Sequence, residues 1–178
     1  MERDQLLQRY AAGERDFRQV NLSGVNLAET KLSGINLIRA NLSHAILREA
    51  DLSGAFLVMA DLRDSNLQSV TLIVANLSGA NLQRADLSHA HLSEAVLTGT
   101  ILSHANLPAA NLEGAMLAGA NLGQANFQNA NLRGANLYGA DLQDADLSGA
   151  ILTRTNLREA NLHEAILPEG QFQGATPE

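Results

Sequence analysis

Residues 75–94 read ANLSG ANLQR ADLSH AHLSE, which is one unit of five residues repeated four times. Each unit holds an alanine or similar residue, then a residue that is usually Asn or Asp, then a central leucine and two variable residues, as in Ala80-Asn81-Leu82. The step continues without insertion or deletion from Phe17 to Phe172, with leucine at 29 of its 32 central sites and phenylalanine at the others. So strict a period indicates a repeat architecture, and it takes precedence over local propensity.

A step of five residues excludes a helix for the repeated region. On an α-helix five residues advance by about 140° beyond a full turn, so the leucines would form no apolar stripe. In an extended chain the alanine two residues before each leucine lies on the same side as that leucine, and the polar residue between them points the other way. The two variable residues must then turn the chain. Four such steps close a square coil of 20 residues.

The unit resembles the motif of the pentapeptide-repeat family, which is Ala, Asp or Asn, Leu and two variable residues, and the resemblance covers residues 15–174. It implies an all-β fold, a right-handed quadrilateral parallel β-helix of about 8 coils. With about 4.8 Å between stacked strands the rod would be roughly 35–40 Å long. The family is abundant in bacteria, cyanobacteria especially, and most of its members have no assigned activity.

The N-terminal residues 1–14 differ from the repeat. Leu6, Leu7 and Tyr10 are followed by Gly13, which predicts a short capping α-helix over residues 2–12 that ends at the glycine. A solenoid end needs such a cover because an open coil exposes its core and its unpaired backbone. The inner sites of the first coil are correspondingly enlarged, to Val20, Val25, Thr30 and Ile35.

The C-terminal end offers no matching helix. Only the six residues Gln173 to Glu178 follow Phe172, and they include Pro177. We expect residues 175–178 to form a tail and the last coil to be open to end-to-end self-association, so a homodimer is one expected state.

Composition excludes several classes of protein. The 178 residues carry a net charge of −7, which disfavours direct binding of nucleic acid because phosphate contacts need a positive surface. The chain has no cysteine, so disulfides and thiolate metal sites are excluded, and a reducing compartment is indicated. The N-terminus lacks the apolar stretch of a signal peptide, and a polar residue in every repeat excludes a membrane span. We therefore expect a soluble cytoplasmic protein.

One of the four faces carries hydrophobic residues at outward positions. We call this face, centred on Leu37 and on the leucines at 20-residue intervals up to Leu137, the apolar face. Contiguous exposed apolar surface usually marks contact with a partner or with another copy. The alternative is that these hydrophobes only stack along the sheet. The candidate protein interface consists of Ile38, Phe56, Val58, Val96, Met116 and Tyr138.

The acidic residues are also unevenly distributed. We call the two faces centred on the Leu22 and Leu27 series the acidic side; they hold ten acids against only Arg48, Arg63 and Arg84. Some members of the family resemble DNA in charge and shape and bind type II topoisomerases, whereas the simpler explanation is solubility. The loop insertions of some topoisomerase-protecting members are missing from this chain. The candidate acidic surface consists of Glu29, Glu49, Asp61, Asp64, Asp141, Asp144 and Asp146, and Asp86, Glu164 and Glu169 lie on the same side.

No constellation in the sequence predicts catalysis. The histidines, which are His44, His89, His91, His104 and His163, occupy variable or outer positions without a recurring carboxylate beside them. Asn and Asp before leucine are interpreted as hydrogen-bonding partners of the backbone at the turns. The glycine columns, such as Gly79 to Gly139 and Gly34 to Gly134, are interpreted as corners with positive φ. We expect no enzymatic activity, no cofactor and no metal.

The sequence thus predicts a non-enzymatic scaffold or protein-interaction module that binds an unknown protein partner, or itself, through a flat face of the solenoid. The apolar face is the first choice for this contact. The alternative is an acidic DNA mimic that regulates a type II topoisomerase such as DNA gyrase.

Overall fold

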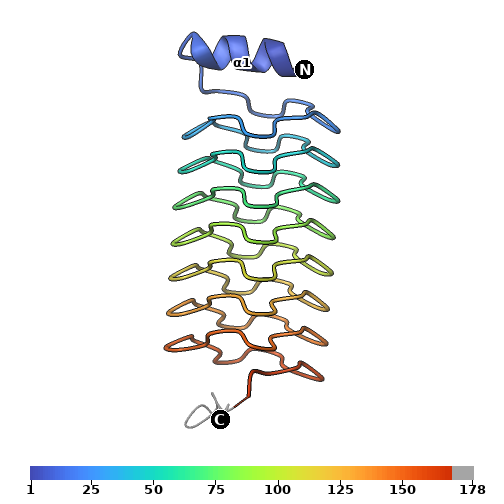
Figure 1. Ribbon diagram of the computed structural model, residues 1–178, viewed down its shortest axis with the longest axis vertical. Coiled ribbons are helices and arrows are strands. Elements are labelled where there is room, and N and C mark those ends of the chain that lie inside the picture. Colours follow the sequence, from blue (N-terminus) through green and yellow to red (C-terminus); the bar gives the residue numbers. More distant parts are fainter. Residues whose placement is uncertain (170–178) are drawn as a thin grey trace.

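A computed structural model describes residues 1–169 of the chain. Helix α1 (Arg3–Ala11) lies across one end, and the rest of the chain winds into a stack of closely similar coils (Figure 1). Each coil pairs with the next in parallel through isolated bridges between residues 20 apart, from Asp16↔Asn36 to Asp146↔Ile166. The fold class predicted from the repeat, an all-β quadrilateral parallel β-helix with a short N-terminal helix, is confirmed. The expectations for Phe172 and for residues 173–178 lie outside the described residues.

The bridges are one residue long because each side of the coil is short, so the hydrogen bonds between coils recur in a fixed pattern. The N–H of Asn81 donates to the oxygen of Ala60 at 2.9 Å, and the N–H of Leu82 donates to the oxygen of Ile101 at 2.7 Å. Each central leucine therefore bonds to the following coil and the residue before it to the preceding coil. This pattern pairs the backbone along the whole rod.

Every corner from Gln19 to Glu164 has positive φ at the second residue after the central leucine. A hydrogen bond closes each corner after the one at Gln19, as from the N–H of Ala85 to the oxygen of Leu82 at 3.0 Å, which together with the positive φ is typical of a type II turn. The positive φ predicted for glycines is confirmed at Gly79 and Gly139. The sequence did not indicate that the other corner residues share this conformation, including the β-branched Val74 at φ 51°.

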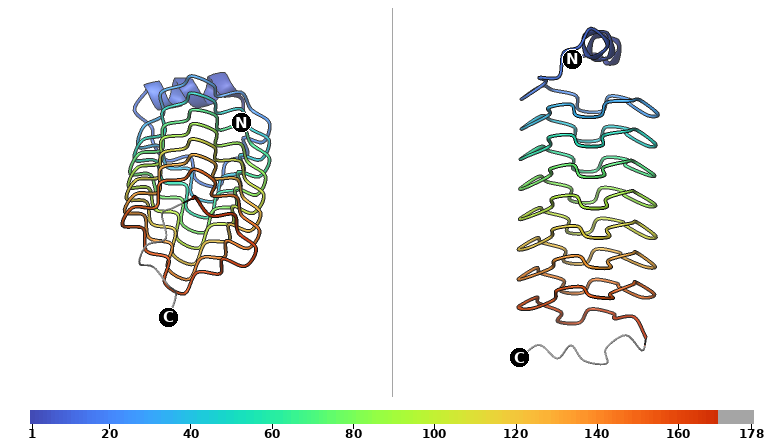
Figure 2. Two further views of the ribbon diagram at one scale, coloured as in Figure 1. Left: turned by 60° about the horizontal axis from the view of Figure 1, so that its bottom comes forward. Right: turned by 90° about the vertical axis from the view of Figure 1, so that its left-hand side faces the viewer.

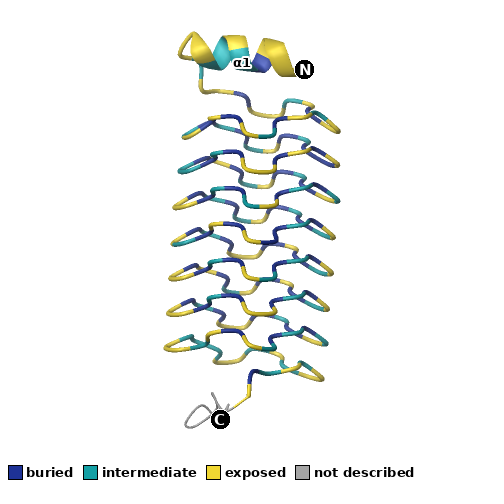
Figure 3. Ribbon diagram, in the orientation of Figure 1, coloured by how far each residue is buried: buried dark blue, intermediate teal, exposed yellow. Residues whose placement is uncertain are grey.

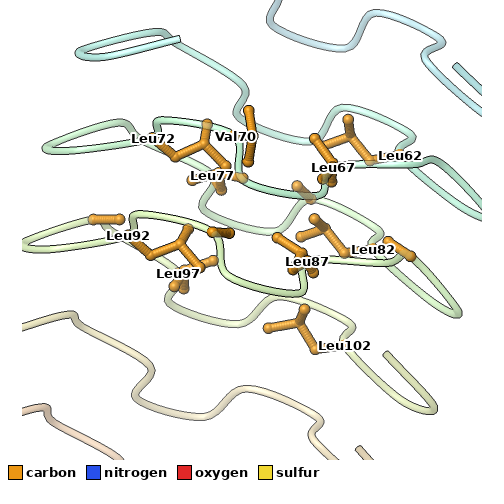
Figure 4. Close-up of a cluster of buried hydrophobic side chains, with 14 of the residues drawn as sticks. Leu62, Leu67, Val70, Leu72, Leu77, Leu82, Leu87, Leu92, Leu97 and Leu102 are labelled. Atoms are coloured by element: carbon orange, nitrogen blue, oxygen red, sulfur yellow. The ribbon is translucent and has the colours of Figure 1, made fainter. Parts of the chain in front are cut away.

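The core is a column of leucines and alanines. The inward side chains are buried along the shaft, while the outward and corner residues are exposed or half-buried (Figure 3). Leu62, Leu67, Val70 and Leu72 of one coil lie above Leu82, Leu87 and Leu92 of the next (Figure 4). Burial of a leucine contributes about 1.5–3 kcal/mol before chain entropy is subtracted, so this stack is the main source of stability.

Helix α1 lies over the first coil, on the axis of the rod (Figure 2). Its Leu6 is fully buried, and the Tyr10 hydroxyl donates to the oxygen of Ser33 at 2.8 Å. The amino group of Met1 donates to the oxygen of Asn21 at 2.6 Å. These contacts place the helix where the sequence predicted a cap. No helix among residues 1–169 is long and apolar enough to cross a membrane.

Candidate functional site

The structure brings the predicted interface residues onto one side of the rod. Consecutive bridges join Asn36, Phe56, Asn76, Val96 and Met116 into one outward column, in which Phe56 lies between two asparagines and Val96 lies next to Met116. The side chains of Phe56 and Met116 are 48% and 44% exposed, and Tyr138 is also exposed. Ile38, Val58 and Val96 are half-buried between neighbouring coils. The residues are therefore in position to contact a partner, and the contact itself stays a prediction.

Three further exposed hydrophobes extend this face and were missed in the sequence. Met59 is 57% exposed and Val74 is 53% exposed, and Ile73 beside Val74 is also exposed. They occupy the corners at the two edges of the apolar face, where sequence reasoning expected only polar or small residues. The runs AFLVMA at 55–60 and TLIVA at 71–75 are the signal, because hydrophobes there continue through the corner positions.

The polar residue of the repeat has a defined task in the corner. The Oδ1 atom of Asn76 accepts a hydrogen bond from the N–H of Ser78 at 3.0 Å, and that of Asn136 accepts one from Tyr138 at 3.1 Å. The same bond forms at every Asn or Asp before a central leucine in residues 16–161 except Asn106. The predicted hydrogen bonding of Asn and Asp to the turn backbone is thus confirmed.

Phe56, Val96 and Met116 cannot make this bond. Within residues 1–169, the N–H groups of Val58, Thr98 and Ala118 accordingly have no protein acceptor. A hydrogen bond of this kind is worth about 0.5–1.5 kcal/mol, so hydrophobes at these three sites sacrifice local stability in exchange for exposed apolar surface. Isoleucines replace Asn or Asp in the same way on other faces, at Ile46, Ile101, Ile151 and Ile166, so the apolar face is distinguished by having three such sites in one column.

The acidic side divides into two halves. Asp61 pairs with Arg63 at 2.6 Å and Asp64 pairs with Arg84 at 2.7 Å, and the hydrogen bonds from these arginines lower the pKa of both carboxyl groups. Arg48 lies 3.5 Å from Glu29 and 3.9 Å from Glu49. The N-terminal half of the acidic side is therefore largely neutralised.

The C-terminal half keeps its charge. Asp141, Asp144 and Asp146 have no ion-pair partner among residues 1–169. Asp146 instead accepts hydrogen bonds from Ser148 and Gln128, and the bond from Ser148 is the main reason why its pKa lies below the usual range. Within residues 1–169, the carboxylates of the acidic side without an ion pair are thus concentrated in the last coils, and Asp86 is a further one near the middle of the rod.

The described residues form no chemical centre. No group of three or more His, Asp or Glu residues in positions 1–169 could hold a metal ion. Two hollows on the described surface are open to solvent, one beside Asp16, Arg18 and Gln19 and one beside Ser148 and Ile166. We therefore assign the candidate site to a surface and not to a pocket.

One of the solved structures that resemble this chain matches it along nearly its whole length. It is HetL from the cyanobacterium Nostoc sp. strain PCC 7120, a pentapeptide repeat protein involved in the regulation of heterocyst differentiation; it is 29% identical, with a TM-score of 0.66 over 96% of this chain and 99% of HetL. A pentapeptide repeat protein of the Arabidopsis thaliana thylakoid lumen is 40% identical over 48% of this chain and 60% of its own, with a TM-score of 0.47. QnrB1, a plasmid-mediated fluoroquinolone resistance protein, is 24% identical over 92% of this chain and 77% of its own, with a TM-score of 0.41.

A comparison with curated protein sequences gives no significant match. The family model for pentapeptide repeats, in contrast, matches residues 16–54, 45–73, 75–114, 109–144 and 140–176. The motif, the coils and this match agree, and the chain belongs to the pentapeptide-repeat family.

Proposed function

We propose that the chain is a non-enzymatic protein-interaction module that binds a protein partner through the apolar face. The observation that carries this proposal is the replacement of the turn-bonding Asn or Asp by Phe56, Val96 and Met116 on one face. These hydrophobes lose a backbone hydrogen bond, and Phe56 and Met116 stay about half exposed in the isolated chain. Such a loss is compensated when a partner covers the side chains.

The chemistry of the face fits a protein surface as its ligand. Aromatic residues and methionine are enriched in protein interfaces, and the apolar face combines Phe56 and Tyr138 with Met59 and Met116. A flat side of a solenoid suits an extended contact and offers no cavity for a small molecule. The family is generally non-catalytic. HetL, the regulator that this chain resembles in fold, matches it over 96% of this chain and 99% of HetL.

The test compares two pairs of substitutions with the same chemistry. Phe56→Asn/Met116→Asn restores the family motif on the apolar face, and Ile101→Asn/Ile151→Asn restores it on two other faces, where both isoleucines are 38% exposed. We expect proteins captured from a lysate of the source cells to be lost with the first pair and retained with the second. Equal capture by both variants would exclude the apolar face.

A second candidate function is that of an acidic DNA mimic that regulates a type II topoisomerase such as DNA gyrase. Its support is the uncompensated charge of Asp141, Asp144 and Asp146. This candidate predicts binding that disappears at high salt and with Asp→Asn changes at the three positions, because exposed charges are screened. Binding through the apolar face is instead expected to survive high salt. A cytoplasmic location stays a prediction for either function.

A further inference from the structure

Along one edge of the apolar face, large residues lie towards the two ends and glycines lie in the middle. One column of corners, each two residues after a central leucine, runs Arg39, Met59, Gly79, Gly99, Gly119, Gly139 and Glu159. Since residues 20 apart stack on one another, the members of this column are regularly spaced along the rod, one in each coil (Figure 2). Two coils before Gly99 stands the exposed Met59, and two coils after it stands the bare Gly139. Three coils before Gly99 stands Arg39, and three coils after it stands Glu159.

Residues in the other columns of the apolar face can be paired about the same level, that of Leu97 and Gly99. At equal distances from the level of Leu97, several large residues on one side correspond to a smaller or polar residue on the other. These pairs are Phe56 and Asn136, Met116 and Asn76, Val74 and Gly114, and Arg154 and Gly34. Ile38 corresponds to Arg158, Val58 to Tyr138 and Ile73 to Glu113, and the remaining positions mostly pair small residues with small ones. Within one molecule the members of most pairs are several coils apart and cannot touch.

We infer that a second copy of this chain covers the apolar face. The two copies pack face to face with antiparallel rods, about a twofold axis that lies in the face along the strand direction at the level of Leu97. This twofold rotation brings each residue of one copy to the residue of the same column in the other copy that lies equally far on the opposite side of the Leu97 level. The same surface is thus used by both copies, and the interface is isologous. The inference rests on the proposed function, because it takes the apolar face as the binding surface and names the protein bound there.

Shape supports this arrangement. Met59 of one copy projects over Gly139 of the other, where nothing lies within 4 Å of the position of an added Cβ atom. The same is true of Gly99 on the axis and of Gly119. The bare backbone at these corners lets the two flat faces approach closely, and the methionine side chain is flexible enough to fill the remaining space.

Charge supports it as well. The Arg39 side chain makes no ion pair or hydrogen bond with residues 1–169, and Glu159 pairs with no cation there. The twofold axis brings Arg39 of each copy to Glu159 of the other, so the pair forms twice. Glu94 lies at the level of the axis, on the other edge of the face. There it faces Glu94 of the second copy, and this contact between like charges opposes the dimer.

The size of the face predicts a weak dimer. Seven coils from Leu37 to Leu157, at about 4.8 Å per coil and about 3.3 Å per residue along a side, offer roughly 500 Å² per copy. The total of about 1,000 Å² lies at the lower limit of specific interfaces. We therefore expect dissociation in the micromolar range.

Sedimentation velocity on the full chain from about 5 to 500 µM tests the inference. We expect wild-type protein to approach twice the monomer mass of 18.9 kDa as its concentration rises. Arg39→Glu alone and Glu159→Arg alone should each weaken the dimer about tenfold, because each creates two like-charge pairs, whereas the double variant should recover wild-type association. Glu94→Gln should strengthen the dimer, and Arg48→Glu, exposed on the acidic side, should leave it unchanged.

A monomer at all concentrations, or a dimer that neither single charge reversal weakens, would overturn the inference. Circular dichroism of each variant excludes loss of the fold as the cause of a change in mass. If self-association fails but Phe56→Asn/Met116→Asn still removes a captured protein, the second copy is wrong and the proposed function stands. If both experiments fail, the apolar face binds neither a second copy of the chain nor another protein.

Discussion

Asn106 donates a hydrogen bond from its Nδ2 atom to the Oδ1 atom of Asp86, one coil away, at 3.2 Å. It is the one Asn or Asp before a central leucine in residues 16–161 that does not accept a bond from the backbone two residues later. Pro108 occupies that later position, and proline has no N–H. The released amide also donates to Ser88 at 2.9 Å and accepts from Asn126 at 3.1 Å, so one side chain links three coils.

We predict that Asn106→Ala destabilises the protein more than Asn81→Ala. Asn106 loses three side-chain hydrogen bonds and leaves Asp86 with fewer donors, which should cost about 1–3 kcal/mol of unfolding free energy. Asn81 loses only the bond that it accepts from Gln83, worth about 0.5–1.5 kcal/mol. Urea denaturation followed by circular dichroism measures both values. Equal losses would mean that the links between coils contribute nothing.

The carboxyl group of Asp86 makes stability depend on pH. Burial raises the pKa of Asp86, but hydrogen bonds from Ser88, Gln68 and Asn106 outweigh burial, so the pKa lies below its ordinary value. A group whose pKa is lower in the folded than in the unfolded state stabilises the fold above the unfolded pKa, about 3.9 for Asp, and loses this contribution as the pH falls through the folded pKa.

We therefore expect the difference in unfolding free energy between wild type and Asp86→Asn to be largest near neutral pH and to shrink as the pH falls below about 4. Denaturation series at several pH values measure this difference. Asn76→Ala is the matched control, because Asn76 accepts the same two hydrogen bonds from Ser78 but carries no titratable group, so its difference should be nearly independent of pH. A constant difference for Asp86→Asn would show that its charge state does not matter to folding.

Val74 tests the cost of the corner conformation. Its φ of 51° is unfavourable for a β-branched residue, whereas Asn tolerates this region. Val74→Asn should therefore raise the unfolding free energy by about 1 kcal/mol and the melting temperature by about 2–4 °C. Ile73→Asn, at the neighbouring position without positive φ, should change stability by less than about 0.5 kcal/mol. A melting temperature that falls with Val74→Asn would show that the valine packs instead of straining the corner.

The coil, its core and the turn bonds of Asn and Asp could be predicted because each depends only on position within the unit of five. The repeat fixes which way Leu87 and Asp86 point, and no long-range information is needed. The position of each outward residue on a face follows from the same register. This is why Phe56, Val96 and Met116 were found together from the sequence alone.

The sequence could not predict features that depend on the direction in which a long side chain extends between coils. Arg84 reaches Asp64 in the preceding coil and Arg63 turns back to Asp61 in its own, so charge that looked uniform along the acidic side is neutralised in one half. Positive φ was assigned from the sequence to the glycine corners, whereas Val74 and Met59 also adopt it. Hydrophobes at those corners were therefore not counted as part of the apolar face.

The last prediction separates folding from binding on the apolar face. Phe56→Asn and Met116→Asn each supply an acceptor for a backbone N–H, that of Val58 or of Ala118, as Asn76 does for Ser78. They remove side chains that are about half exposed, so little burial is lost. We expect each change to raise the unfolding free energy of the monomer by about 0.5–1 kcal/mol, measured by urea denaturation at low micromolar concentration.

A loss of more than about 1 kcal/mol would place Phe56 and Met116 among the residues that hold the coils together, since only burial in the monomer could outweigh the restored hydrogen bond. A gain in stability that is accompanied by a loss of binding would assign them to recognition, because a partner is then the only surface that accounts for hydrophobes at sites where asparagine folds better.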